Sequence, residues 1–173
     1  MVHQRILLIG CGGSGKSTLA RKLGEKTGLP VVHLDQLYWK PGWQPLSKEE
    51  FDDRLRIELA KDQWIIDGNF DRTIPLRLER CDTVIFLDLP RIVCIMSVLK
   101  RVISSYGRTR PDMGAGCPER FDLSFLKWVW NFNKGKRDKY LSLLASSGKA
   151  VYHIRSRREL PALIRKIAGT EGE

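Results

Sequence analysis

The sequence lacks the cysteine patterns of a disulfide-bonded scaffold or a zinc site. Its 173 residues include four cysteines, with no C-x-x-C pair and no metal-binding spacing. Small secreted domains and zinc modules depend on such patterns. We therefore expect reduced thiols in a cytoplasmic protein at all four positions: Cys11, Cys81, Cys94 and Cys117.

Long uncharged stretches are also absent. Charged residues and a proline interrupt the apolar run at residues 84–103, and no stretch approaches the roughly 20 apolar residues that a membrane-spanning helix needs. Near the N-terminus, Arg5 leads directly into an apolar run, which is unlike a signal peptide. We expect neither a membrane span nor a signal peptide.

Acidic residues are outnumbered. The chain has 30 Lys and Arg against 20 Asp and Glu, which gives a net charge of +10. This balance suits a polyanionic partner, either a nucleotide or a nucleic acid. The length and the 42% hydrophobic content fit one globular domain over residues 1–173. No pattern fixes an oligomeric state.

A phosphate-binding motif is present near the N-terminus. Residues 10–17 fit G-x-x-x-x-G-K-[ST], the Walker A pattern, between an apolar run at 5–9 and a helical pattern that ends at Gly28. Glycines let backbone N–H groups converge on phosphate oxygens, and the helix N-terminus adds its dipole. A ligand-free glycine turn is the alternative, and the strand–helix context argues against it. The motif predicts an ATP site formed by Gly10, Cys11, Gly12, Gly13, Ser14, Gly15, Lys16, Ser17 and Thr18.

Lys16 and Ser17 have separate tasks in this motif. The Lys16 ammonium group reaches the outer phosphates, and the Ser17 hydroxyl is a ligand for Mg²⁺.

Short apolar segments alternate with helical patterns along the chain. One helix is predicted to begin at a capping box formed by Ser47 and Glu50. This alternation predicts an α/β fold with a parallel sheet, whose ligands bind beyond the carboxyl ends of the strands. The predicted strands are residues 5–9, 31–34, 63–66, 84–87 and 151–154.

About sixty residues separate the last two strands, more than one crossover helix requires. Residues 92–106 are helical by pattern, and residues 107–118 form a loop rich in glycine, proline and arginine. Asp122 is predicted to cap the next helix, in which Trp128 and Trp130 belong to an apolar pattern and are expected in the core.

Together these residues resemble adenylate-kinase-like P-loop kinases. The stretches HLDQLYWKPGW (residues 33–43) and WIIDGNF (residues 64–70) are similar, more narrowly, to bacterial proteins named DNA topology modulation proteins. The resemblance implies a three-layer P-loop NTPase fold with a five-stranded parallel sheet of order 2-3-1-4-5. It also implies ATP and Mg²⁺ as ligands, an acceptor-side segment at about residues 35–62 and a helical lid at about residues 101–121.

In that fold the third strand lies beside the first, which places Asp67 next to Ser17 and predicts that both hold Mg²⁺. Asp88 is the second candidate for the metal, although it also suits a turn before Pro90. Asp35 occupies the place of a carboxylate that binds substrate or acts as a base in related kinases. A cap role stays open for Asp35, and toward a phosphate acceptor it would only orient the substrate.

Phosphoryl transfer is helped mainly by positive charge around the moving group. Arg101 also suits the polar face of its helix, and a zinc lid is excluded because Cys117 stands alone where such lids use four cysteines. The predicted catalytic arginines are Arg101, Arg108, Arg110 and Arg137.

The remaining assignments concern the two substrates. Asn69 and Arg72 are assigned to the acceptor, and Arg72 is one residue further from Asp67 than the corresponding arginine of adenylate kinases. Ser156 and Arg157 follow the last strand, where the fold holds adenine, and Ser156 also begins a capping box. Three aromatic residues either stack on a planar base or cover the sheet end: Tyr38, Trp39 and Trp43.

Two functions are consistent with these patterns. The first is an ATP-dependent kinase that moves the γ-phosphate to a small acceptor such as a nucleoside or nucleotide. The second is a DNA-associated ATP-binding protein or ATPase without a small acceptor, which the positive charge favours. No helix-turn-helix, zinc or strand-platform motif supports the second, so the kinase is the preferred prediction.

Overall fold

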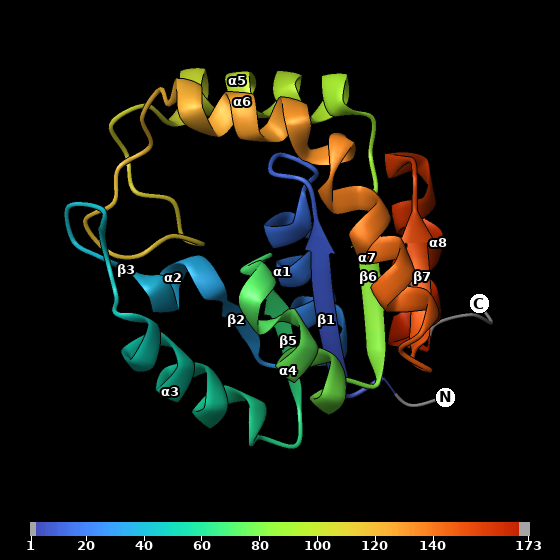
Figure 1. Cartoon of the computed structure of the whole chain (residues 1–173). Coiled ribbons are helices and arrows are strands. Elements are labelled where there is room, and N and C mark those ends of the chain that lie inside the picture. The colour runs from blue at the N-terminus through green and yellow to red at the C-terminus, as the bar shows by residue number, and fades with distance from the viewer. Residues whose placement is uncertain (1–2, 170–173) are drawn as a thin grey trace.

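The computed structural model describes residues 3–169, and a five-stranded parallel sheet runs through it (Figure 1). Its spatial order is β2-β5-β1-β6-β7. Counting only these strands in chain order, this is 2-3-1-4-5, so the predicted topology is confirmed. Every strand boundary lies within one residue of the prediction. The strands are β1 (Arg5–Gly10), β2 (Val31–His33), β5 (Trp64–Asp67), β6 (Thr83–Leu87) and β7 (Ala150–Ile154).

Successive residues of each strand point to opposite faces of the sheet, and this alternation builds two cores. In β1, Leu7 and Ile9 belong to one buried cluster, whereas Ile6 and Leu8 belong to the other. Helices cover both faces, which gives the predicted three layers. The helices of the described residues are α1 (Lys16–Thr27), α2 (Leu34–Tyr38), α3 (Lys48–Leu59), α4 (Ile74–Arg80), α5 (Arg91–Ser105), α6 (Leu123–Asn131), α7 (Lys136–Ala145) and α8 (Leu160–Ala168).

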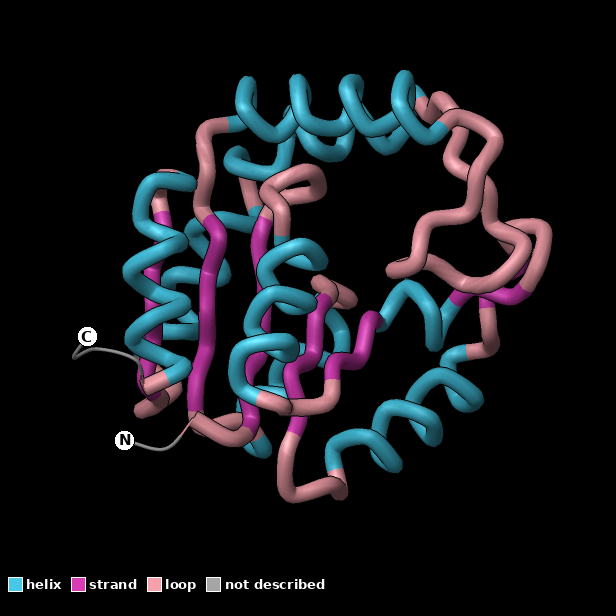
Figure 2. Tube along the Cα trace, turned by 180° about the vertical axis from the view of Figure 1, so that it is seen from behind, coloured by secondary structure: helices cyan, strands magenta, loops and turns pink. Residues whose placement is uncertain are grey.

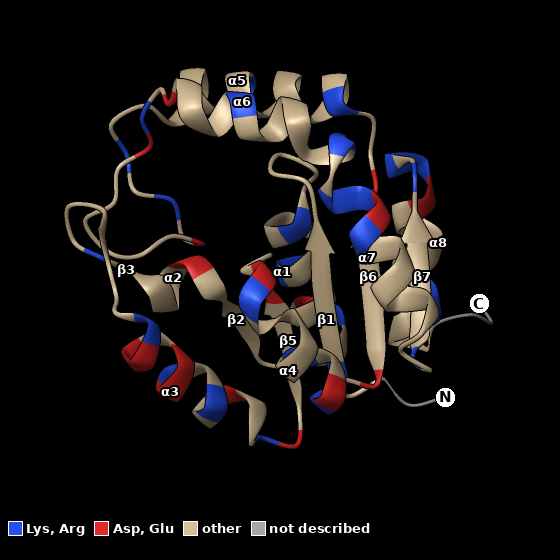
Figure 3. Ribbon diagram, in the orientation of Figure 1, with Lys and Arg blue, Asp and Glu red and all other residues tan. Residues whose placement is uncertain are grey.

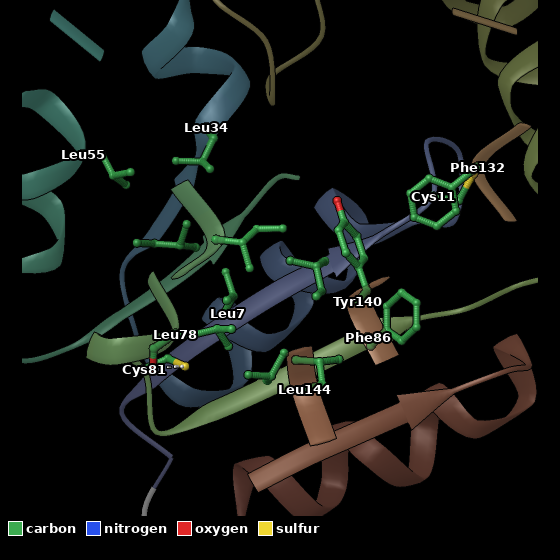
Figure 4. Packing of buried hydrophobic residues seen from close by; sticks show 14 of the residues in the cluster. Leu7, Cys11, Leu34, Leu55, Leu78, Cys81, Phe86, Phe132, Tyr140 and Leu144 are labelled. Carbon is green, nitrogen blue, oxygen red and sulfur yellow. Dashed lines mark hydrogen bonds between the residues drawn. The ribbon is translucent and has the colours of Figure 1, made fainter. Parts of the chain in front are cut away.

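Helices α1 and α8 pack on the Ile6–Leu8 face through Leu19, Leu23 and Leu163. The opposite face carries the larger cluster, which Figure 4 shows around Tyr140 and Phe86. Helices α3, α4 and α7 contribute to this cluster, and so do α5 and α6 beyond the end of β1. Because α5 and α6 lie over the carboxyl end of the sheet (Figures 1 and 2), they form one wall above the motif at residues 10–17.

Local sequence signals place several helix ends as predicted. Ser47 and Glu50 form the reciprocal capping box at the start of α3, and the Asp122 carboxylate accepts a hydrogen bond from the backbone N–H of Phe125 at the start of α6. Ser156 and Glu159 form a second capping box that opens a 3₁₀ turn (Arg157–Glu159) before α8. Two further 3₁₀ turns, Asp71–Thr73 and Phe132–Lys134, and a hairpin of β3 (Trp39–Lys40) with β4 (Gln44–Pro45) complete the described elements.

Candidate functional site

The glycine-rich motif forms a tight loop between β1 and α1. At Gly13 the backbone has φ +79°, and an added Cβ would lie 2.4 Å from the carbonyl oxygen of Cys94 on α5. Gly15 caps α1 in the left-handed conformation, with φ +99°. Both positions therefore require glycine, and they aim the start of α1 at the space below α5.

Lys16 is the first residue of α1. Its Nζ atom donates hydrogen bonds to the carbonyl oxygens of Gly10 and Cys11, both at 2.9 Å. The ammonium group is thus held over the loop, where the amide dipoles and the helix N-terminus favour an anion.

Beside this loop lies a cavity of about 690 Å³, within the size range of small-molecule sites. It brings together many of the residues assigned to ATP, metal and acceptor. Those that line it are Gly12, Gly13, Gly15, Lys16, Ser17, Thr18, Asp35, Trp39, Trp43, Asp67, Asn69, Arg101, Arg110 and Arg157.

Asp67 is a buried carboxylate at the end of β5. Its register partner on β2 is His33, whose Nδ1 atom lies 3.0 Å from Asp67 Oδ2. Among the described residues, Asp67 Oδ1 has no hydrogen-bond partner. A buried carboxylate oxygen without a donor suits a cation or its bound water, so Asp67 and Ser17 fit a Mg²⁺ ion that also takes phosphate oxygens.

Asp35, in the first turn of α2, is the second carboxylate of the cavity. Its pKa is raised to about 6, mainly by burial and then by the charge of Asp67, with a smaller contribution from Asp112, whereas Lys16 and Arg110 oppose the rise. Asp35 is therefore close enough to the Lys16 loop to feel its charge. A carboxyl group with this pKa can accept a proton near neutral pH.

A long loop between α5 and α6, residues 106–122, closes the cavity on its far side. It contacts the segment of α2 and the β3–β4 hairpin at several points. The backbone N–H of Gly42 donates to the carbonyl oxygen of Gly116 at 2.9 Å, and Trp43 Nε1 donates to the Pro118 carbonyl oxygen at 3.1 Å. We call residues 106–122 the bridging loop, because it joins the α5–α6 wall to the hairpin (Figure 1).

Two of the arginines that line the cavity are held by buried carboxylates of the bridging loop. Arg110 pairs with Asp112 and with Glu119, each at 2.8 Å. Arg101 reaches the other carboxylate oxygen of Glu119 at 3.1 Å. The two arginines therefore share one carboxylate, and their guanidinium groups lie close together.

Several predicted residues lie outside the cavity lining. Arg108 is exposed on the bridging loop. Arg137 pairs with Asp88, its Nε lying 2.9 Å from both carboxylate oxygens, and Asp88 also accepts from His153 Nε2 at 2.7 Å. The other predicted residues outside the lining are Gly10, Cys11, Ser14, Tyr38, Arg72 and Ser156.

The aromatic residues divide between the two predicted roles. Tyr38 packs edge-on against Phe51 and Phe70 and so covers the sheet end. Trp39 and Trp43 line the cavity and meet edge-on at 5.5 Å between ring centroids. Of the three predicted aromatic residues, these two are therefore the ones that a planar ligand in the cavity could contact.

The prediction that Trp130 lies in the core is wrong. Its side chain is 43% exposed, and the guanidinium of Arg91 lies 4.2 Å from the ring centroid. Trp128 packs against the buried cluster, as predicted, and also lines the cavity. Helix α6 therefore turns only part of its apolar pattern inward, with Val129 fully buried.

Residue patterns gave no signal for two positioning side chains. No pattern in the sequence gives His33 a partner, and its pairing with Asp67 depends on strand register. Arg77 on α4 is fully buried and donates to the carbonyl oxygens of Gly68, Asn69 and Phe70. It thereby fixes the turn after β5, where Asn69 Oδ1 accepts from the backbone N–H of Gly10 at 3.0 Å.

Comparison with known proteins gives one informative similarity. No family model matches the chain. The chain is similar to an adenylate kinase of Ruminiclostridium cellulolyticum, with 35% identity over 101 residues, which covers 47% of this chain and 46% of that protein. The chain thus spans under half the length of that relative. The similarity supports a relationship to adenylate-kinase-like P-loop kinases. In the described residues, none of the helices has the length and hydropathy to cross a membrane.

Proposed function

We propose that this chain is an ATP- and Mg²⁺-dependent phosphotransferase of the adenylate-kinase-like type, which moves the γ-phosphoryl group to a small acceptor. One observation carries the proposal. A single cavity joins the Lys16 loop, the buried Asp67 carboxylate and the Asp35 carboxyl group. Phosphoryl transfer needs these three elements within one site: a phosphate cradle, a metal-binding carboxylate and a group that orients or deprotonates the acceptor.

Each residue has a task in this proposal. The residue 10–18 loop binds the phosphates of ATP through its N–H groups and Lys16, while Ser17 and Asp67 hold the metal. Bound Mg²⁺ would neutralise the oxygens of the outer phosphates. We assign Arg101 and Arg110, which line the same cavity, to stabilising the charge of the transferred group. We assign Arg157, whose Nη2 donates to the Gly13 carbonyl oxygen at 3.3 Å, to the nucleoside side of ATP.

Two segments carry the acceptor side and the closure of the site. We assign the acceptor to the segment at about residues 35–62, with Asp35, Trp39, Trp43 and Asn69 facing it. We assign the lid to about residues 101–121, because the bridging loop already reaches the hairpin and covers the cavity. Exclusion of water by such a lid favours transfer over hydrolysis. Arg108 and Arg137 lie outside the cavity lining. In this proposal they reach the transferred group only when the lid, for Arg108, or α7, for Arg137, moves toward the cavity.

The proposal includes a reducing, cytoplasmic setting, because all four cysteines are free and buried. The narrower similarity to DNA topology modulation proteins and the charge of +10 keep DNA as a second candidate partner. Helices α5 and α6 carry Lys and Arg but no Asp or Glu (Figure 3), and this face is the one we would assign to DNA.

The decisive experiment measures ADP release from Mg²⁺-ATP by the whole chain, alone and with nucleosides, nucleoside monophosphates or duplex DNA. We expect stimulation by a small acceptor, formation of its phosphorylated product and loss of turnover in EDTA. The Lys16→Ala variant should lose turnover. Lys22→Ala, on the exposed side of the same helix, is the matched control and should keep it. Stimulation by DNA alone, without a phosphorylated small molecule, would replace the kinase by a DNA-linked ATPase.

A further inference from the structure

The charges that line the cavity divide between its two ends. At the loop of residues 10–18, the cations contact uncharged oxygens. Lys16 donates to backbone carbonyls, and Arg157 donates to the Gly13 carbonyl and, at 2.6 Å, to Ser97 Oγ. Within the described residues these cations are therefore not paired with carboxylates and stay available to an anion. A site for the phosphates of ATP requires such positive charge.

At the opposite end, carboxylates match or outnumber the cations. Arg110 is paired with both Asp112 and Glu119, and Arg101 is paired with Glu119. Asp112 and Glu119 are 6% exposed, so these are buried ion pairs. The bridging loop accordingly carries both basic and acidic residues (Figure 3).

The last arginine at this end, Arg120, lies with its guanidinium 4.8 Å from the centroid of the Trp43 ring. Asp35 adds a further acidic group to the lining, and Asp122 borders it where it caps α6. An entering phosphate dianion would face these carboxylates. To gain Arg101 or Arg110 it would have to break a buried ion pair, which leaves an uncompensated buried charge and costs several kcal/mol. To gain Arg120 it would have to draw that guanidinium away from the Trp43 ring.

The arginine expected to bind an acceptor phosphate is also engaged elsewhere. Arg72 lies outside the cavity lining, and its two terminal nitrogens donate to both oxygens of Asp52 on α3 at 2.6 and 2.7 Å. This bidentate geometry is the one that a phosphate would need from the same guanidinium group. The acceptor end therefore offers carboxylates and indole faces instead of an available phosphate clamp.

Building on the proposed kinase activity, we propose that the acceptor carries no phosphate: it is a nucleoside, whose base lies against Trp39 and Trp43 and whose hydroxyl group faces Asp35. The hydroxyl oxygen forms a bond to the γ-phosphorus while the bond from that phosphorus to the β–γ bridging oxygen breaks. ADP leaves with the electron pair of the broken bond, and the hydroxyl proton passes to the Asp35 carboxylate and then to solvent. The products are ADP and a nucleoside monophosphate, so atoms and charge balance.

The electrostatics of Asp35 support this assignment. Groups from three elements act on it, namely Lys16 of α1, Asp67 of β5, and Arg110 with Asp112 of the bridging loop. An acceptor that is already a phosphate needs no base, whereas a hydroxyl group must lose its proton during attack. A carboxyl group beside the transfer site thus fits a hydroxyl acceptor better than a phosphate acceptor.

The test compares matched acceptors with the whole chain and Mg²⁺-ATP labelled at the γ-phosphate. Each nucleoside is paired with its own 5′-monophosphate, so that the base is constant. We expect at least one nucleoside to be converted to its monophosphate with kcat/KM at least tenfold above that of the paired monophosphate. Preferential formation of diphosphates from monophosphates would overturn the nucleoside assignment and leave the kinase standing. ATP hydrolysis without phosphorylation of any small acceptor would overturn both proposals.

Two variants test the reason given for phosphate exclusion. Glu119→Gln and Asp112→Asn each release arginine charge at the acceptor end with little change of shape. Either variant should raise kcat/KM for monophosphates by about tenfold, and the conversion of nucleosides should change less. Asp53→Asn, an equivalent substitution on the exposed face of α3, is the control. If both variants fold, as judged by circular dichroism, and monophosphates are still rejected, the buried ion pairs do not set acceptor choice.

Discussion

The Nδ1 atom of His33 lies 3.0 Å from Oδ2 of Asp67, and the two residues are register partners on neighbouring strands β2 and β5. The imidazole therefore occupies one carboxylate oxygen, and the other, buried oxygen has no hydrogen-bond partner among the described residues. Such a contact fixes the orientation of the carboxylate that we propose for Mg²⁺, as outer-shell partners do in metal sites.

Replacement of His33 should weaken Mg²⁺ use without removing the nucleotide site. We expect His33→Ala to raise the Mg²⁺ concentration for half-maximal turnover by about tenfold, the lower end of typical outer-shell effects, with a smaller change in KM for ATP. His33→Asn, which keeps a donor, should recover part of the loss. A titration of Mg²⁺ at saturating ATP measures the effect. Equal shifts in the half-maximal Mg²⁺ concentration and in KM for ATP would argue against a positioning role.

Asp35 should make stability depend on pH in a defined direction. Its pKa is raised from 3.8 to about 6 in the folded protein, so its contribution to stability is fully present below pH 3.8 and is lost as pH rises through 6. Asp35→Asn removes this loss. Relative to the wild type, the variant should therefore be more stable at pH 8 than at pH 4, which means a larger free energy of unfolding.

Urea unfolding of both proteins across this pH range measures the difference, and the exposed Asp53→Asn variant should show none of it. The same Asp35→Asn variant should lose roughly 100-fold or more in kcat, the usual contribution of a positioned base. A gain in stability without a loss of kcat would remove Asp35 from the transfer step.

Gly114 should be essential for the contact between the bridging loop and the hairpin. An added Cβ there would lie 2.1 Å from the carbonyl oxygen of Trp39. Gly114→Ala should therefore displace the loop at a cost of about 1–3 kcal/mol and raise the rate at which trypsin cleaves it after Arg108. The cleavage rate measures the displacement. Gly135→Ala is the matched control, because nothing lies within 4 Å of its Cβ.

Arg110 and Arg108 should contribute differently to phosphoryl transfer, although they are only two residues apart. Arg110 lines the cavity and is paired with Glu119, whereas Arg108 is exposed on the same loop. We expect Arg110→Ala to lower kcat by about 100-fold, the scale for removing one electrostatic stabiliser of a transition state. Arg108→Ala should slow transfer more than it weakens ATP binding, by a smaller factor than Arg110→Ala. Single-turnover rates and ATP dissociation constants separate the two effects.

Local patterns determined the framework of this protein. The motif at residues 10–17 placed the phosphate loop, and apolar runs placed every strand of the parallel sheet within one residue. Ser47 and Asp122 marked the starts of α3 and α6 correctly. These features depend on neighbours in the chain, because glycine conformation, strand alternation and helix capping all act over a few residues.

The tertiary structure alone decided which charges meet. His33 pairs with Asp67 across two strands. Arg101 and Arg110 both form ion pairs with Glu119, and Arg72 forms one with Asp52. Such contacts join residues from different elements, and a row of similar arginines in the sequence carries no sign of which carboxylate each will find. The sequence therefore predicts a phosphate-binding loop, and folding decides where positive charge is available and where carboxylates neutralise it.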